Sequence, residues 1–145
     1  GISLGTLLLK TEAATWLTQA VFGRLGLSSL SPLLIVAFIA LFNILIHLGF
    51  ASATSLAATL IPIVIALMQG LDRPDINLIG LVLIQQFVVS FGFILPVNAP
   101  QNMLAYGTGT FSTKDFIKSG IPLTIIGYLL ILLFSATYWK WVGLL

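Results

Sequence analysis

The sequence has 145 residues, of which 59% are hydrophobic and only 7% are charged. A soluble domain carries about a quarter charged residues, so this composition predicts an integral membrane protein instead. The lack of cysteine excludes disulfides and thiolate metal sites, and the net charge of +2 is spread over loops, which predicts no nucleic-acid-binding patch.

Residues 1–30 are predicted to hold the end of a membrane helix, followed by an amphipathic helix that lies in the membrane interface. The interfacial part runs from Lys10 to Arg24 and would place Trp16 at headgroup depth. A connecting loop with one helical turn is the alternative. Because the chain begins at Gly1 and carries no signal-peptide pattern, we expect a fragment or one subunit of something larger.

Residues 25–71 contain no charged side chain, although a single spanning helix needs only about 20 residues. Two full crossings would need a hydrated loop between them, and none of the usual loop residues is present. The segment 31–69 is therefore predicted to be a re-entrant hairpin, which enters the membrane, turns and leaves on the same side. Its non-helical tip must be buried in protein or line a cavity, because lipid cannot satisfy open backbone groups.

The limits of the hairpin limbs follow from local signals. Ser31 and Pro32 are typical of a helix start, and the first limb can run to about Phe50. The second limb, 55–69, is roughly 22 Å long at 1.5 Å per residue, which is short for a membrane crossing. Pro62 is expected to interrupt it. The tip is rich in small and hydroxylated residues and reads HLGFASATS over 47–55.

Residues 76–107 are predicted to form a discontinuous transmembrane helix. The part 76–97 is long enough to span the membrane. Pro96 and Pro100 lack N–H groups and disfavour helical geometry in the residues before them. The helix should therefore unwind between these prolines, at membrane depth, and restart over 101–106.

Polar residues precede this break at two places. In the turn before the helix, Asp75 or Asn77 can act as the N-cap. Gln85 and Gln86 lie inside the apolar span, and we interpret them as hydrogen-bonding groups between helices rather than as ligands.

A capping-box pattern, S-T-K-D, opens a predicted short cytoplasmic loop helix over 112–119. Gly120 is expected to end this helix, and Pro122 to start the last transmembrane helix, 122–142. Lys114 and Lys118 make this loop the more basic one. The positive-inside rule then places it in the cytoplasm and both ends of the hairpin outside.

The two breaks, at 52–55 and 98–100, carry the predicted chemistry. Each ends one helical half and begins another, so the second halves present free N–H groups and the positive end of a helix dipole to a carboxylate or phosphate. Freed carbonyls could coordinate a small cation. Paired broken helices near the membrane midplane predict the binding site of a secondary transporter, although they could also serve only packing and kinks. The neutral hydrogen-bonding side chains are Ser52, Thr54, Asn98 and Asn102.

His47 is the only ionisable group deep in a predicted span, and it shares a helix face with Asn43, Ala51 and Thr54. Such groups are functional candidates by default, and its position one turn below the tip favours a positive charge beside an anion. A neutral imidazole bonded to a neighbouring carbonyl is the alternative. No buried acid is available to orient this histidine toward a serine, so we do not expect a membrane hydrolase or another enzyme.

Both breaks resemble those of the divalent anion:sodium symporter family, also called the sodium:sulfate or dicarboxylate transporters. The resemblance covers about two thirds of the chain, in the right order. The matching stretches are FASAT at 50–54, LIP at 60–62, FILPVNAPQN at 93–102 and AYGTG at 105–109, leading to Lys114 and Asp115.

This resemblance implies the fold class, an all-α integral membrane protein in which the re-entrant hairpin, the broken helix and the last span form the second half of an inverted-repeat elevator transporter. It implies a homodimer in a lipid bilayer, with several spans and a place in a bacterial plasma membrane. The N-terminal repeat, which carries the partner hairpin, is missing here. The chain would then hold half of the substrate site.

One departure from the family concerns sodium. Members usually carry Ser-Asn-Thr at the tip, where this chain has Ser52, Ala53 and Thr54. In sodium-coupled members the Asn amide and a Thr five residues earlier help to bind sodium, and these positions are Ala53 and Leu48 here. Ala99, often Thr in symporters, also lacks a hydroxyl. The tip looks like the exchanger branch, similar to citrate:succinate antiporters and plastid 2-oxoglutarate/malate translocators. A weak sodium site is left only to the backbone of Ala51, Ala53 and Asn98.

The sequence therefore predicts a secondary transporter of di- or tricarboxylates that exchanges dicarboxylates such as succinate, malate or 2-oxoglutarate. His47 would supply positive charge where symporters use a second sodium. A sodium-coupled dicarboxylate or sulfate symporter is the alternative, and a non-transporting membrane packing subunit is the alternative from another class. Apart from sodium no cofactor is expected. The predicted substrate-binding residues are Ser52, Ala53, Thr54, Ser55, Asn98, Ala99, Pro100 and Asn102.

Overall fold

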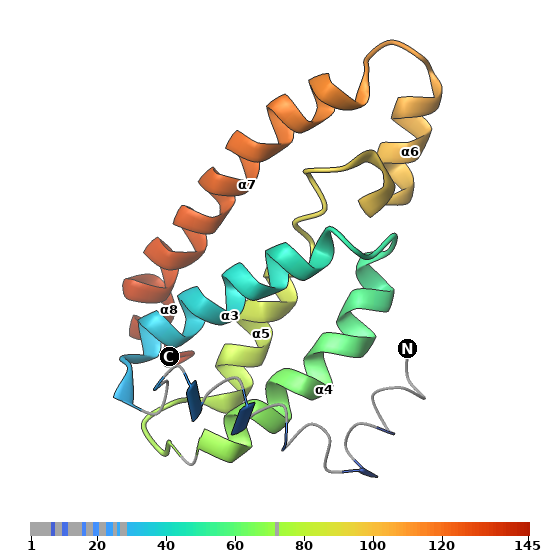
Figure 1. Cartoon of the computed structure of the whole chain (residues 1–145). Coiled ribbons are helices and arrows are strands. Elements are labelled where there is room, and N and C mark those ends of the chain that lie inside the picture. Colours follow the sequence, from blue (N-terminus) through green and yellow to red (C-terminus); the bar gives the residue numbers. More distant parts are fainter. Residues whose placement is uncertain are drawn as a thin grey trace.

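The computed structural model describes residues 29–71 and 73–145, together with isolated positions before them (7, 10, 11, 16, 19, 20, 23, 24 and 26). The end of a membrane helix and the interfacial helix predicted for residues 1–30 therefore lie almost entirely outside the described residues. Every regular element in the described part is helical (Figure 1). In chain order the elements are α3 (Pro32–His47), α4 (Ala53–Leu71), α5 (Leu78–Val88), the 3-10 helix η2 (Pro96–Asn98), α6 (Pro100–Gly107), α7 (Thr113–Ala136) and α8 (Tyr138–Trp141).

The helices α3 and α4 form a hairpin that packs against α5, and α3 also packs against α7. In Figure 1, α3 begins and α4 ends at the same end of the molecule, where α5 begins and α7 ends. The hairpin tip at 48–52 stops part-way along α7, whereas α6 and the loop that leads to α7 extend beyond it. A hydrogen bond of 2.8 Å from the Tyr128 hydroxyl to the Ala37 carbonyl joins α7 to α3.

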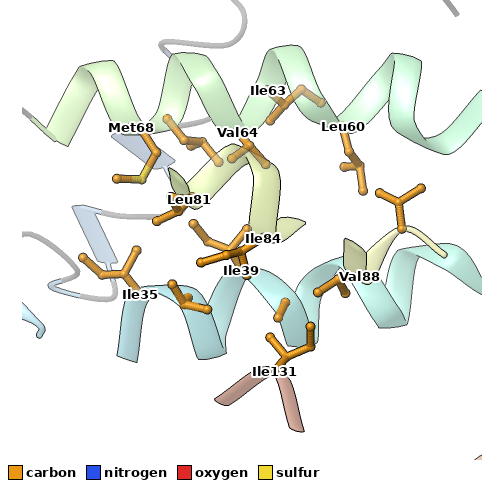
Figure 2. Close-up of a cluster of buried hydrophobic side chains, with 14 of the residues drawn as sticks. Ile35, Ile39, Leu60, Ile63, Val64, Met68, Leu81, Ile84, Val88 and Ile131 are labelled. Carbon is orange, nitrogen blue, oxygen red and sulfur yellow. The ribbon is translucent and has the colours of Figure 1, made fainter. Parts of the chain in front are cut away.

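A core of aliphatic side chains holds the hairpin and α5 together. Figure 2 shows side chains of α3 and α4 facing one another with those of α5 between them, and one residue of α7 at the edge. In lipid, association of this kind is driven by van der Waals packing rather than by exclusion of water. The labelled members are Ile35, Ile39, Leu60, Ile63, Val64, Met68, Leu81, Ile84, Val88 and Ile131.

The outer face of α7 is apolar and exposed, in keeping with a membrane protein. Among the described residues, α7 and α8 form the one helix, Thr113–Trp141, that is long and apolar enough to cross a membrane. Its exposed apolar side chains include Leu123, Ile125, Ile126, Leu129, Leu130 and Leu133. The all-helical, membrane-type fold is thereby supported, and the re-entrant course of the hairpin stays a prediction.

The predicted start of the hairpin is confirmed, since Ser31 is the N-cap of α3 and its hydroxyl oxygen accepts from the Leu34 N–H at 3.4 Å. The first limb ends at His47, before the expected Phe50. The second begins at Ala53, slightly before the expected start, because the Ser52 hydroxyl accepts from the Ser55 N–H at 3.4 Å as an N-cap side chain does.

Pro62 does not interrupt the second limb, so that expectation was wrong. The helix α4 runs through Pro62 and has 19 residues, about 28 Å at 1.5 Å per residue. Proline is tolerated in membrane helices because neighbouring helices and local adjustments compensate for the lost hydrogen bond. The length of this limb therefore gives no separate argument for a re-entrant course.

The broken helix unwinds much earlier than the prolines indicate. The helix α5 ends at Val88 rather than continuing to residue 97, and residues 89–95 are non-helical. Its last turn tightens, with the N–H groups of Ser90 and Phe91 donating to the carbonyls of Phe87 and Val88 at 3.1 and 3.0 Å. The restart after the second proline is confirmed, since α6 begins at Pro100. Asn77 is the N-cap of α5 and accepts from the Gly80 N–H at 3.2 Å, while Asp75 does not cap it.

The predicted loop helix 112–119 and last span 122–142 are one continuous helix, so the expected end at Gly120 was wrong. The capping box at its start is confirmed: Ser112 and Asp115 exchange side-chain and backbone hydrogen bonds. Gly120 serves packing, because a Cβ there would overlap the carbonyl group of Phe93 in the non-helical segment. Pro122 lies inside α7 without ending it.

Candidate functional site

The two breaks are joined by the side chain of Asn98, in which the amide nitrogen donates to the carbonyl of His47 at 2.8 Å and to that of Phe50 at 2.9 Å. The amide oxygen accepts from the Leu95 N–H at 3.1 Å. Asn98 is 1% exposed. A residue of the second break therefore holds the end of α3, across about fifty positions of sequence, and the two predicted breaks form one local structure.

Gly92 lies at the centre of this structure. A Cβ on Gly92 would lie 3.3 Å from Asn98 Cβ, from the Asn98 carbonyl oxygen and from His47 Cε1. Its carbonyl accepts from the Asn102 amide nitrogen at 2.6 Å. Gly92 was not among the predicted site residues. The one signal that could have indicated it is an isolated glycine inside an apolar run, which is typical of close backbone approach.

The bond between Asn98 and Phe50 also brings the starts of two helices to the same region, since Phe50 shortly precedes α4 and Asn98 shortly precedes α6. The starts of α4 and α6 therefore both lie near the residues that Asn98 joins. Thr54, Ser55 and Pro100 are exposed at these helix starts. Of the other predicted substrate-binding residues, Ser52, Ala53 and Asn102 are partly buried and Asn98 and Ala99 are buried.

The polar groups of the tip are not equally free. The Ser52 hydroxyl oxygen already accepts a hydrogen bond at the start of α4. The Asn98 amide nitrogen donates two hydrogen bonds, and the amide oxygen accepts one. For the predicted weak sodium site, Ala51 and Ala53 flank Ser52 at the tip, with Asn98 close by through its bond to Phe50. Ala51 itself is exposed.

His47 lies behind the tip and faces inward. It is 2% exposed, and neither ring nitrogen has a hydrogen-bond partner among the described residues. The Asn98 main chain nonetheless acts on the ring, so the alternative of an imidazole beside a neighbouring carbonyl stays a prediction. The ring contacts the region of Gly92 and Asn98 rather than the exposed start of α4.

A buried polar cluster continues from His47 along the contact between α3 and α5. Asn43 and Gln85 are 1% and 0% exposed, and the Asn43 amide nitrogen donates to the Gln85 main-chain carbonyl at 3.3 Å. The Gln85 side chain has no partner among the described residues, and Gln86 is exposed. The interpretation of both glutamines as inter-helix hydrogen-bonding side chains was therefore wrong, because the bond uses the main chain of Gln85.

Two grooves in the described surface are lined by residues other than the predicted site residues. One is apolar and lies between α7 and the segment around Phe91 and Phe93. The other lies near the start of α3 and is lined by groups that include Asp75, Ser135 and Lys140. None of the predicted site residues lines either of these two grooves.

An all-helical, apolar chain with two joined breaks is typical of the membrane region of transport proteins. The chain belongs to the sodium:sulfate symporter family, because the family's transmembrane region matches residues 1–145. A membrane protein of Cupriavidus necator is 57% identical over 143 residues, 99% of this chain and 28% of that protein. The L-tartrate/succinate antiporter of Escherichia coli is 32% identical over 145 residues, covering 99% of this chain and 29% of the antiporter.

Sodium-coupled proteins are also among the relatives. The human Na(+)/dicarboxylate cotransporter 3 is 30% identical over 110 residues, which is 76% of this chain and 17% of the cotransporter. The chain thus spans less than a third of the length of these relatives. The predicted family is confirmed, and its named members are transporters rather than enzymes.

Proposed function

We propose that this chain forms one side of the substrate site of a dicarboxylate transporter, and that the transporter works by exchange. The observation that carries this proposal is the hydrogen bonding of Asn98 to His47 and Phe50, which brings the starts of α4 and α6 together. The similarity to an L-tartrate/succinate antiporter over the whole chain supports both the substrate class and the mode.

The start of α4 holds one carboxylate of the substrate. Its first N–H groups and its dipole favour an anion, and the exposed hydroxyl of Thr54 adds a neutral donor beside Ser52. The start of α6, from Pro100 to Asn102, approaches the substrate from the other side. Because Thr54, Ser55 and Pro100 are exposed on this chain, we propose that a second, related half closes the site, as in the inverted-repeat architecture of the resemblance.

We further propose that His47 supplies positive charge from behind the site once an anion is bound there, because burial without a counter-charge favours the neutral imidazole in the empty site. It is buried beside Gly92 and Asn98, so it acts on the anion across the tip rather than by direct contact. Ala53 and Leu48 offer no side-chain oxygen to a sodium ion, which supports a protein-borne charge in this place. A sodium-coupled dicarboxylate or sulfate symporter is the second candidate, favoured by the family name and by the cotransporter relatives.

Reconstituted vesicles test the proposal. The full polypeptide that carries residues 1–145 is placed in proteoliposomes, and uptake of labelled succinate is measured with and without succinate inside. We expect uptake to require internal succinate and to be unchanged when choline replaces sodium. Strong uptake driven by a sodium gradient into vesicles without internal substrate would contradict exchange and favour the symporter. If succinate neither raises the melting temperature nor is transported, the substrate class is wrong.

Replacing His47 tests its role in the site. We expect His47→Ala to weaken succinate binding about tenfold, which corresponds to about 1.4 kcal/mol, because a positive charge near the anion is lost. Ser135→Ala is a matched control, since Ser135 is a buried polar residue of α7 whose hydroxyl has no partner among the described residues. Binding is measured by calorimetry on folded protein. Unchanged affinity in His47→Ala would leave the histidine with a packing role only.

A further inference from the structure

The C-terminal end of α3 is a cluster of carbonyl groups that a helix leaves without intrahelical partners. Within it, the Leu45 and Ile46 carbonyls accept from the N–H groups of Leu48 and Gly49 at 3.3 and 3.0 Å, as in an ordinary helix end. The His47 carbonyl accepts from the Phe50 N–H at 3.1 Å in the same way. It also accepts a bond from the second break, as the Phe50 carbonyl does. Such a cluster lies at the negative end of the helix dipole, and unwound carbonyls of this kind are where coupling cations bind in transporters.

The Asn98 amide nitrogen occupies that position. It places one N–H on the His47 carbonyl at 2.8 Å and the other on the Phe50 carbonyl at 2.9 Å. An amide nitrogen has two N–H groups, so its donor capacity is used completely. The opposite orientation of the amide would set its oxygen against two carbonyl oxygens and lose the bond from the Leu95 N–H, so the hydrogen bonds fix the orientation.

The surroundings keep this amide in place. Asn98 is 1% exposed, so solvent does not compete for its donors. Gly92 permits the close approach, because any side chain there would press on Asn98 Cβ and on the His47 ring at 3.3 Å. The next helix is tied to the same point by the bond of 2.6 Å from Asn102 to the Gly92 carbonyl.

We propose that the Asn98 amide takes the place of a coupling cation at the end of α3. It satisfies the carbonyls of His47 and Phe50 and holds the two breaks in register, so these oxygens are not available to sodium. Asn98 is thus a positioning residue that determines ion independence. This inference rests on the proposed exchange function, because ion independence matters only for a transporter. The role of the Asn98 hydrogen bonds can still be tested by sodium binding alone.

The test replaces the donor with an acceptor. In Asn98→Asp a carboxylate would face two carbonyl oxygens, and a cation between them would relieve the repulsion. We therefore expect the full polypeptide carrying Asn98→Asp to melt lower than wild type in choline chloride, and to gain about 2 °C or more from sodium chloride at equal ionic strength, beyond any gain in wild type. The gain should saturate with sodium concentration.

Asn77→Asp is the matched control, because the Asn77 amide also donates to a main-chain carbonyl, that of Gly143 at 2.9 Å, far from the breaks. It should show no extra sodium effect. If Asn98→Asp does not fold, Asn98→Ala decides, since it also exposes the two carbonyls and should gain a weaker sodium-specific stabilisation. The same sodium response in wild type and in the Asn98 variants would overturn the inference.

Succinate added to the same samples separates this inference from the proposed function. A sodium effect confined to the Asn98 variants, without any succinate effect on wild type, would support the ion-replacing amide and contradict dicarboxylate binding. Succinate stabilisation of wild type, with no sodium effect in the variants, would support dicarboxylate binding and contradict the ion-replacing amide.

Discussion

Gly120 and Gly92 are two positions at which the absence of a side chain lets another segment of the chain approach closely. Gly120 stands before a proline and is typical of a helix end, yet it lies inside α7 against the carbonyl of Phe93. Gly92 stands in an apolar run and lies against His47 and Asn98. In each case the reason is a contact with a residue distant in sequence, which no local pattern contains.

A methyl group at Gly120 tests this packing role. Gly120→Ala would place a Cβ onto the Phe93 carbonyl group, so we expect a loss of about 1–3 kcal/mol in the free energy of unfolding, the usual range for overpacking. Gly107→Ala is the control, because nothing lies within 4 Å of a Cβ at that position. Chemical denaturation in detergent measures both variants. An equal stability of Gly120→Ala and wild type would mean that α7 is not seated on the segment 89–95.

Asp75 gives a prediction about pH. The Arg73 guanidinium donates to both oxygens of the Asp75 carboxylate at 2.8 and 2.6 Å, and this hydrogen bonding lowers the pKa of Asp75 below its usual value. A carboxyl group whose folded-state pKa is lowered stabilises the fold above its ordinary pKa, and this contribution is lost as the pH falls through the folded-state pKa. The effect is small because the pair is near the surface.

We therefore expect Asp75→Asn to melt below wild type at pH 6 and to melt at the same temperature as wild type once the pH is below the folded-state pKa. The melting temperature across this pH range is the measurement. The bond of 2.7 Å from Arg73 to the Leu30 carbonyl does not depend on Asp75 and should persist in the variant. A constant difference between the two proteins at every pH would contradict the ion pair.

At the scale of elements, helix starts were predictable and helix ends were not. Ser31, Asn77 and Ser112 cap their helices as the sequence indicates, because an N-cap depends on side chains within one turn. Pro62 and Pro122 were misread, since the breaking effect of proline in water is weaker where neighbouring helices surround it. The early end of α5 is followed by Gly92, which packs against residues of other segments that no pattern within the helix contains.

The capping box of α7 can be tested directly. Ser112→Ala removes the oxygen that accepts from the Asp115 N–H at 3.3 Å, and we expect a loss of about 1 kcal/mol in the free energy of unfolding. Ser119→Ala is the control: its hydroxyl donates to carbonyls of the preceding turn and caps nothing. A larger loss in Ser119→Ala than in Ser112→Ala would contradict the assignment of the cap.

For the whole molecule, the hairpin tip and the restart of the broken helix at Pro100 were predictable, because hydroxylated and proline residues concentrate there, whereas the unwinding from residue 89 was not. The contact between the two breaks was not predictable, since it depends on the Asn98 amide donating to the carbonyls of His47 and Phe50, about fifty residues earlier in the chain. The hairpin tip that ends part-way along α7 agrees with a re-entrant course (Figure 1). Membrane sidedness is a separate property, which labelling can decide.

Single cysteines in a cysteine-free background of the full polypeptide give that measurement. With a membrane-impermeant maleimide we expect Pro74→Cys to react from outside and Thr110→Cys from the cytoplasm. Both positions are exposed, the segments between α4 and α5 and between α6 and α7 lie at opposite ends of the fold (Figure 1), and the positive-inside rule places the latter in the cytoplasm. Ala51→Cys, at the tip, should react more slowly when succinate is present. If Ala51→Cys instead reacted from the cytoplasm as fast as Thr110→Cys, and succinate had no effect, the hairpin would consist of two full crossings.

The seating of α7 on the segment 89–95, through Gly120 against Phe93 and Gly127 against the Phe91 ring, has a mechanical consequence. If the substrate-carrying part travels during turnover, α7 must travel with it, and the broad aliphatic surface of this helix then slides through acyl chains. Turnover should accordingly slow in viscous or thicker bilayers, while the affinity for the anion stays the same. The viscosity of the membrane would in that way limit the transport rate.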